Sequence, residues 1–176
     1  MDQESKDGND IPSTFDAYKH IHNFRHRNQI TALGAATLFL SEAEPFSSSK
    51  FGQWVDTLKG QILRNHYFFS QLDGRIVGYC GWALTSHETA RDWIDNKRVI
   101  TFEECCDGPC LLVMAARVAK KGIHPYQAMV MRSLYGDREA AYWKRITPKG
   151  VRVAAFNLRA PGVRRPLLDI CIELIG

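Results

Sequence analysis

The chain has 176 residues, of which 45% are hydrophobic and 24% are charged, a composition typical of a soluble globular domain with its own core. The sequence contains no run of about 18 apolar residues, so we expect no membrane-spanning helix. Its net charge of +4 favours acidic partners, such as nucleic acid, a phospholipid surface or an acidic carrier protein, without choosing among them.

Residues 1–13 are polar and acidic, and we expect them to be disordered. They lack the apolar segment of a secretory signal, so a cytoplasmic location is expected. In residues 15–30, Phe15, Tyr18 and Ile21 stand near helical spacing, with lysine, histidine and arginine on the other face. This pattern predicts a helix whose basic face is either solvated or a docking surface for an acidic partner.

Two more helices are predicted before the first strand. Residues 30–40 are rich in alanine and leucine, which favour helix. Residues 51–65 repeat apolar side chains at helical spacing and so predict an amphipathic helix. Ser48 or Ser49 is the predicted N-cap of that helix.

The Asp-Gly pair at residues 73–74 separates two runs of aromatic and β-branched residues, which predicts a β-hairpin. Gly78 and Gly81 lie within its second strand, and they indicate a bulge or a close backbone approach. The segment TSHETARDWIDN then predicts a short helix with Ser86 as its N-cap.

Residues 110–119 have the length and composition of a buried strand. A helix is predicted after Pro125, ending at Gly136 as a left-handed C′ glycine. Residues 140–157 predict a second hairpin. We therefore expect one α/β (α+β) domain over residues 14–160, with a mixed sheet flanked by helices, followed by a basic linker and an apolar tail over residues 161–176.

The turn at Lys120, Lys121 and Gly122 joins a predicted strand to a helix N-terminus, where free N–H groups and positive charge attract anions. It loosely resembles the coenzyme A pyrophosphate loop of the GNAT acetyltransferases, which would make these three residues cofactor-binding. The alternative is an ordinary turn with solvated lysines.

Histidines are the usual general bases near neutral pH, and His66, His87 and His124 all adjoin predicted elements. The sequence assigns none of them a partner. Three of the five cysteines lie in the segment ECCDGPC, but no second pair completes a four-ligand zinc site. We therefore predict no bound metal and reduced thiols.

Residues 77–83, VGYCGWA, resemble the RTX-toxin-activating lysine acyltransferases, which carry Val-x-Tyr-Cys-Ser-Trp-Ala at this place. Three further segments are similar to that family and follow in the same order: residues 33–46, 62–69 and 142–150. The resemblance covers residues 33–156.

This resemblance implies a single GNAT-like domain, often dimeric and cytoplasmic. It implies transfer of a fatty acyl group from acyl-carrier protein to internal lysines of a protoxin-like protein, without bound coenzyme A. The expected partners are then acyl-carrier protein and a protein substrate, not nucleic acid. Gly78 and Gly81 would leave room for the acyl chain.

The family uses a histidine and an aspartate as its catalytic pair. The matching positions here hold Phe46 or Ser47 and Ala115, and neither place carries a general base. Three hypotheses follow. Either another residue acts in catalysis, with His66, His87 and Ser47 as candidates, or the protein is an inactive homologue with a binding or regulatory role, or it is a coenzyme A-dependent acetyltransferase.

Overall fold

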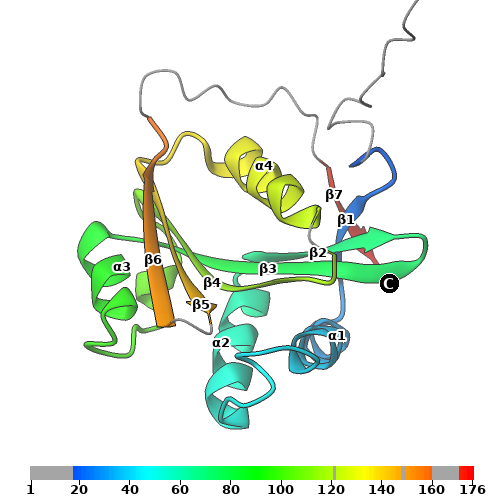
Figure 1. Ribbon diagram of the computed structural model, residues 1–176, viewed down its shortest axis with the longest axis horizontal. Helices are drawn as coiled ribbons and strands as arrows, with labels where there is room; N and C mark the ends of the chain where they lie inside the picture. The colour runs from blue at the N-terminus through cyan, green and yellow to red at the C-terminus, as the bar shows by residue number, and fades with distance from the viewer. Residues whose placement is uncertain (1–17, 121, 148–149, 160–170) are drawn as a thin grey trace, which may run out of the picture.

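In the described part of the chain, seven strands form one mixed sheet with the order β6-β5-β4-β3-β2-β1-β7 (Figure 1). The computed structural model describes residues 18–120, 122–147, 150–159 and 171–176. The strands are β1 His22–His26, β2 Tyr67–Leu72, β3 Arg75–Thr85, β4 Cys110–Val118, β5 Ala140–Thr147, β6 Gly150–Asn157 and β7 Ile172–Ile175.

Two neighbouring pairs in the sheet, β4 with β5 and β1 with β7, are parallel, and the other pairs are antiparallel. The parallel pair β4–β5 needs a crossover connection, and α4 provides it. The mixed sheet and its helices confirm the predicted α/β class and a single domain.

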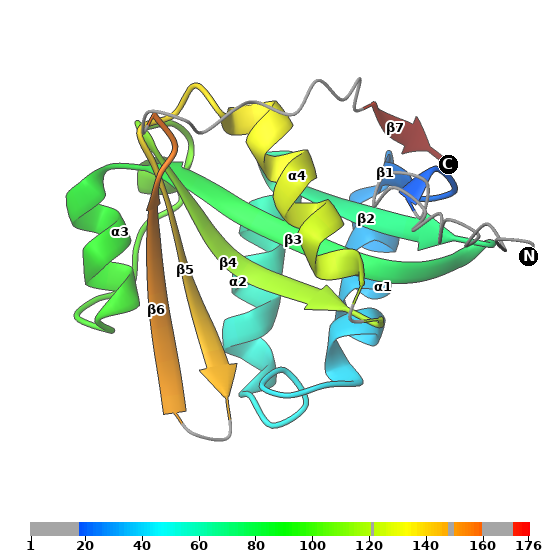
Figure 2. The ribbon, with the colours of Figure 1, turned by 45° about the horizontal axis from the view of Figure 1, so that its top comes forward.

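Helices cover both faces of the sheet, with α4 on one face and α1, α2 and α3 on the other (Figure 2). A short 3-10 turn, η2, precedes β4. None of the helices in the described residues has both the length and the apolar composition required to cross a bilayer. Their bounds are α1 Gln29–Ser41, α2 Phe51–Leu63, α3 His87–Ile94, α4 Ile123–Tyr135 and η2 Glu103–Cys105.

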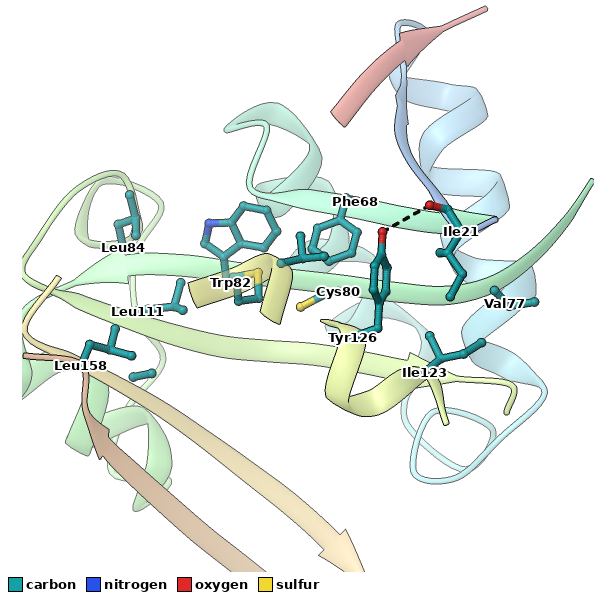
Figure 3. Close-up of a cluster of buried hydrophobic side chains, with 13 residues drawn as sticks. Ile21, Phe68, Val77, Cys80, Trp82, Leu84, Leu111, Ile123, Tyr126 and Leu158 are labelled. Carbon is teal, nitrogen blue, oxygen red and sulfur yellow. Dashed lines mark hydrogen bonds between the residues drawn. The ribbon is translucent and has the colours of Figure 1, made fainter. Parts of the chain in front are cut away.

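The strand β3 runs through the middle of the core and packs on both sides. Cys80, Trp82 and Leu84 face α4 and belong to one cluster with Phe68 of β2 and Tyr126 of α4 (Figure 3). Side chains of a strand alternate between faces, so the intervening residues Tyr79 and Ala83 pack against the helices of the opposite face. Every residue of β3 from Val77 to Thr85 is buried, which explains its nearly continuous apolar sequence.

The bulge predicted at the two β3 glycines is confirmed, whereas the groups that approach them closely are side chains and not backbone. The pairing register shifts next to Gly81 in β3 and at Ser70, which pairs with Gly78. The shift at Gly81 leaves Met114 of β4 as an extra residue, because Gly81 pairs with Ala115 and the next residue, Trp82, pairs with Val113.

The predicted helix over residues 15–30 is wrong where the structure describes it. Residues 22–26 form β1, and α1 begins only at Gln29, capped by the Asn28 side chain. β1 has partners on both sides, β2 and β7, and this ladder overrides the helical spacing of a few apolar residues.

Two predicted caps are also wrong. α2 is preceded by Lys50, which makes no side-chain cap, while the Ser48 and Ser49 hydroxyls bond to Glu44 and to the Pro45 carbonyl. α4 ends before Gly136 as predicted, but this glycine has a right-handed φ of −67°. Ser86 does cap α3, accepting from the Thr89 N–H as predicted.

The predicted disordered segment, residues 1–13, lies outside the described residues, as does most of the predicted linker and tail. Within that tail, residues 172–175 form β7, which adds to the sheet beside β1. The end of the tail is therefore a strand of the same sheet.

Candidate functional site

His87 is the first residue of α3, and it is held between two groups from the start of β5 and the turn before it. Its Nδ1 lies 2.8 Å from the Tyr142 hydroxyl, and its Nε2 lies 3.0 Å from Glu139 Oε2. The cap at Ser86 fixes where α3 begins, directly after the buried strand β3, and so directs the His87 side chain toward β5. Sequence reasoning named His87 as a candidate without a partner, and the fold supplies two.

The two hydrogen bonds define the tautomer of the neutral ring. An ionised carboxylate only accepts hydrogen bonds, so Nε2 carries the proton that is donated to Glu139. Nδ1 then presents its lone pair, and the Tyr142 hydroxyl donates to it. The hydrogen bond from His87 also lowers the pKa of the Glu139 carboxyl below its usual value, which keeps this group ionised near neutral pH.

Glu139 and Tyr142 also line a surface hollow of about 430 Å³ between β5 and the end of β6. Arg159 lies 3.5 Å from the Glu139 carboxylate, so the hollow has both signs of charge next to an apolar wall. The remaining lining residues are Ala140, Ala155, Phe156 and Asn157.

This arrangement has the parts of an acid–base site. A carboxylate that orients a histidine also stabilises the imidazolium formed when the ring accepts a proton. The Tyr142 hydroxyl, which is bonded to His87 Nδ1, marks the position from which a substrate proton reaches the ring. Glu139 lines the hollow and is about 45% exposed, while His87 is about 40% exposed and adjoins the hollow through its contacts with Glu139 and Tyr142.

A second candidate place lies where β4 and β5 separate. The two parallel strands pair only from Cys110 with Ala140 to Val113 with Trp143, and then diverge (Figure 2). The extra residue Met114 comes immediately after the last pair. In open α/β sheets, ligands bind beyond the carboxyl ends of parallel strands, which is where these strands separate.

The predicted anion loop lies at this same end of β4. Gly122 is the N-cap residue of α4 and makes no side-chain cap, while its carbonyl accepts from the Tyr18 hydroxyl at 2.9 Å. Lys120 is exposed, and Lys121 lies outside the described residues. A side chain at Gly122 would meet nothing within 4 Å, so close packing does not require a glycine there. The cofactor role of this loop stays a prediction.

Ser47 is exposed and donates a hydrogen bond of 2.6 Å to Glu44 Oε1. Hydrogen bonds from Ser47 and then Ser48 lower the pKa of the Glu44 carboxyl. A carboxylate with a lowered pKa is a poor base, so this pair gives Ser47 little activation as a nucleophile.

The other two positions that match the family's catalytic pair are apolar. The Phe46 ring packs edge-on against Trp54 at 4.4 Å, and Ala115 is 2% exposed. Both belong to the hydrophobic cluster under α1 and α2. Neither residue carries a group able to move a proton.

His66 precedes β2, and its ring lies nearly parallel to that of Trp82 at 5.9 Å. Burial, followed by the nearby Arg64 guanidinium, lowers the pKa of His66 to about 4. The ring is therefore neutral near pH 7 and only weakly basic. The structure gives His66 no carboxylate partner among the described residues, in contrast to His87.

The space beside the two glycines of β3 is already filled. A Cβ built on Gly81 would lie 2.1 Å from Gln61 Oε1, and one built on Gly78 would lie 2.7 Å from Gln127 Nε2. Both glutamines are buried. The expected room for an acyl chain at Gly78 and Gly81 is therefore wrong, because glutamine amides occupy it.

Sequence reasoning missed Glu139 and Tyr142 as functional residues. Glu139 precedes a predicted strand and Tyr142 lies within it, which is an ordinary pattern for a hairpin. In the described residues no group of three or more histidine, cysteine or acidic side chains is arranged to hold a metal ion.

Comparison with protein-family models finds none that matches this chain, and comparison with curated proteins finds no significant match. The function is therefore argued from the site.

Proposed function

We propose that the protein transfers a fatty acyl group from acyl-carrier protein to lysines of a protein substrate, with His87 as the general base. The observation that carries this proposal is the position of His87 between the Glu139 carboxylate and the Tyr142 hydroxyl, two groups that line the hollow.

A lysine amine has a free pKa of about 10.4 and must lose a proton before it attacks. In the proposed reaction that first proton is released to solvent. As the neutral amine attacks, its nitrogen gives a second proton to His87 Nδ1, through or in place of the Tyr142 hydroxyl, while Glu139 stabilises the imidazolium. The amine nitrogen then forms a bond to the acyl carbon as the carrier thioester's C–S bond breaks. The proton on His87 returns to the leaving thiolate, so charge and atoms balance.

Three further observations support acyl transfer. The segments around residues 77–83 and 142–150 resemble the toxin-activating acyltransferases. β4 and β5 separate at their carboxyl ends, where open α/β sheets commonly bind ligands. The net charge of +4 suits an acidic carrier.

The test is transfer of radiolabelled acyl groups from acyl-carrier protein to a protoxin that an active acyltransferase modifies. We expect His87→Gln to slow transfer by about 10²–10⁴-fold, the usual contribution of a general base. Glu139→Gln should lower the rate by a smaller factor, and His20→Gln, a change at an exposed histidine, should leave it unchanged. Undiminished transfer by His87→Gln would exclude this mechanism.

A second function, carrier binding without chemistry, is favoured by the apolar character of Phe46 and Ala115. In that case acyl-carrier protein binds with measurable affinity by calorimetry, but no label moves to the protoxin. The two functions therefore give opposite results in one pair of measurements.

A further inference from the structure

Several polar atoms around Trp82 are buried and have no hydrogen-bond partner among the described residues. Trp82 is fully buried, and its indole Nε1–H has no partner with good hydrogen-bond geometry, although it lies near enough to the Tyr135 hydroxyl to offset part of the effect by which burial raises the pKa of Tyr135. The others are Arg64 Nε, His66 Nδ1 and Arg138 Nε. The indole Nε1–H and the two arginine Nε–H groups are donors, and buried donors are nearly always paired, so unpaired ones indicate a place built for an acceptor.

Three side chains from separate parts of the fold surround the Trp82 indole. The His66 ring lies 5.9 Å away, the Tyr135 ring lies 5.4 Å away, and the Arg25 guanidinium carbon lies 6.0 Å from the ring centre. Figure 3 shows the indole on the side of β3 that α4 covers. The end of β1, the start of β2 and the end of α4 thus meet at this side chain.

Acidic side chains of the described residues balance only part of the positive charge at this place. Arg25 donates from Nε to the Tyr67 carbonyl at 2.6 Å but forms no ion pair with a described carboxylate. Burial lowers the pKa of its guanidinium. Arg138 pairs at 3.0 Å with Asp107, whose side chain is 81% exposed.

The positive charges of three arginine side chains act on the His66 ring. After burial, the largest causes of the lowered pKa of His66 are Arg64 and then Arg25, and Arg138 contributes as well. Three guanidinium groups therefore lie close enough to act on His66. Partly buried positive charge without a counter-ion is costly, and a bound anion removes that cost.

We infer that Arg25, His66, Trp82 and Arg138 form a binding site for a small oxyanion, a carboxylate or phosphate group, next to the Trp82 indole. The oxygens of such a group only accept hydrogen bonds, and indole and guanidinium N–H groups only donate them. The aromatic rings of Trp82 and Tyr135 suit a ligand with an apolar part beside its charge. This site is separate from His87 and does not depend on the proposed acyl transfer.

The direct test is to follow the Trp82 indole N–H resonance by ¹H–¹⁵N NMR, assigned with Trp82→Phe. The probes are inorganic phosphate, acetate and benzoate, each added at constant ionic strength against chloride. We expect a saturable shift of this resonance. A response to phosphate alone identifies a phosphate site, and a response to acetate or benzoate identifies a carboxylate site.

Arg25→Gln should weaken the binding by at least about tenfold, the effect of losing one charge-assisted contact. Arg152→Gln, at an exposed arginine of β6, is the matched control and should bind as the wild type. His66→Gln provides a second variant if Arg25→Gln unfolds, and it should weaken binding several-fold. In the wild type the pKa of His66 should rise from about 4 when the anion binds.

The inference is overturned if none of the three probes gives a saturable shift. It is also overturned if chloride alone gives the same shift, or if Arg25→Gln and Arg152→Gln weaken binding equally. Each of these results would mean that the unpaired donors form no oxyanion site.

Discussion

Replacing Gly81 by alanine tests how closely the Gln61 side chain packs against β3. The new Cβ would lie 2.1 Å from Gln61 Oε1 and 2.5 Å from its Cδ, so the glutamine must move. Gln61 is fully buried, and its Oε1 accepts from the Tyr79 hydroxyl at 2.8 Å. A shift of the amide therefore separates it from a hydroxyl that is itself buried.

Overpacking a core typically costs about 1–3 kcal/mol, and leaving a buried hydroxyl unpaired costs about 1–3 kcal/mol. These costs are not additive here, because the movement of Gln61 that relieves the first produces the second. We therefore expect Gly81→Ala to lower the free energy of unfolding by about 2 kcal/mol. In a protein of this size, that corresponds to a fall in Tm of about 4–8 °C.

The assay is urea unfolding followed by circular dichroism, with Gly34→Ala as the matched control. Gly34 lies in α1, and a Cβ there meets nothing within 4 Å, so this change should be neutral or stabilise by up to about 1 kcal/mol. If Gly81→Ala is as stable as Gly34→Ala, the close packing of Gln61 against β3 is refuted.

Two further predictions concern pH and helix capping. Burial and then Arg64 lower the pKa of folded His66 from 6.5 to about 4, so the unfolded chain binds more protons in that window. The free energy of unfolding should therefore fall as the pH falls from 6.5 toward 4. His66→Gln should make urea unfolding less steeply pH-dependent between pH 5 and 6.5. A residual slope is expected from His124, whose pKa is also lowered by burial. Asn28→Ala should lower the free energy of unfolding by about 1 kcal/mol, because the Asn28 side chain accepts from two N–H groups of α1. Lys50→Ala, at the start of α2 where no side-chain cap exists, should change it by less than about 0.5 kcal/mol, and equal effects of the two changes would contradict the capping role of Asn28.

Most of the fold could be predicted because local signals agreed with it. The Asp-Gly turn, the amphipathic pattern of α2 and the Ser86 cap all depend on residues close together in the sequence. β1 could not be predicted in this way. Its strand character comes from β2 and β7, and β7 pairs with it from the far end of the sequence.

At the candidate site, too, local sequence features could be predicted and contacts made by distant segments could not. His87 was predicted as a candidate from its residue type and its place at the start of a helix. Its partners Glu139 and Tyr142 could not be assigned, because the parallel pairing of β5 with β4 brings them to α3. The glycines of β3 predicted a bulge or a close backbone approach, but the groups that approach them are the side chains of Gln61 and Gln127, which the local sequence does not indicate.

The pairing of β7 with β1 also affects the order in which the chain is made. Among the described strands, β1 leaves the ribosome first and β7 last, yet they are neighbours in the sheet. Until residues 172–175 emerge, the outer edge of β1 has no strand partner in the described structure, and an unpaired edge can pair with another chain. Synthesis of the nascent protein therefore includes a period in which the β1 edge is exposed, and residues 172–175 close it once they have emerged.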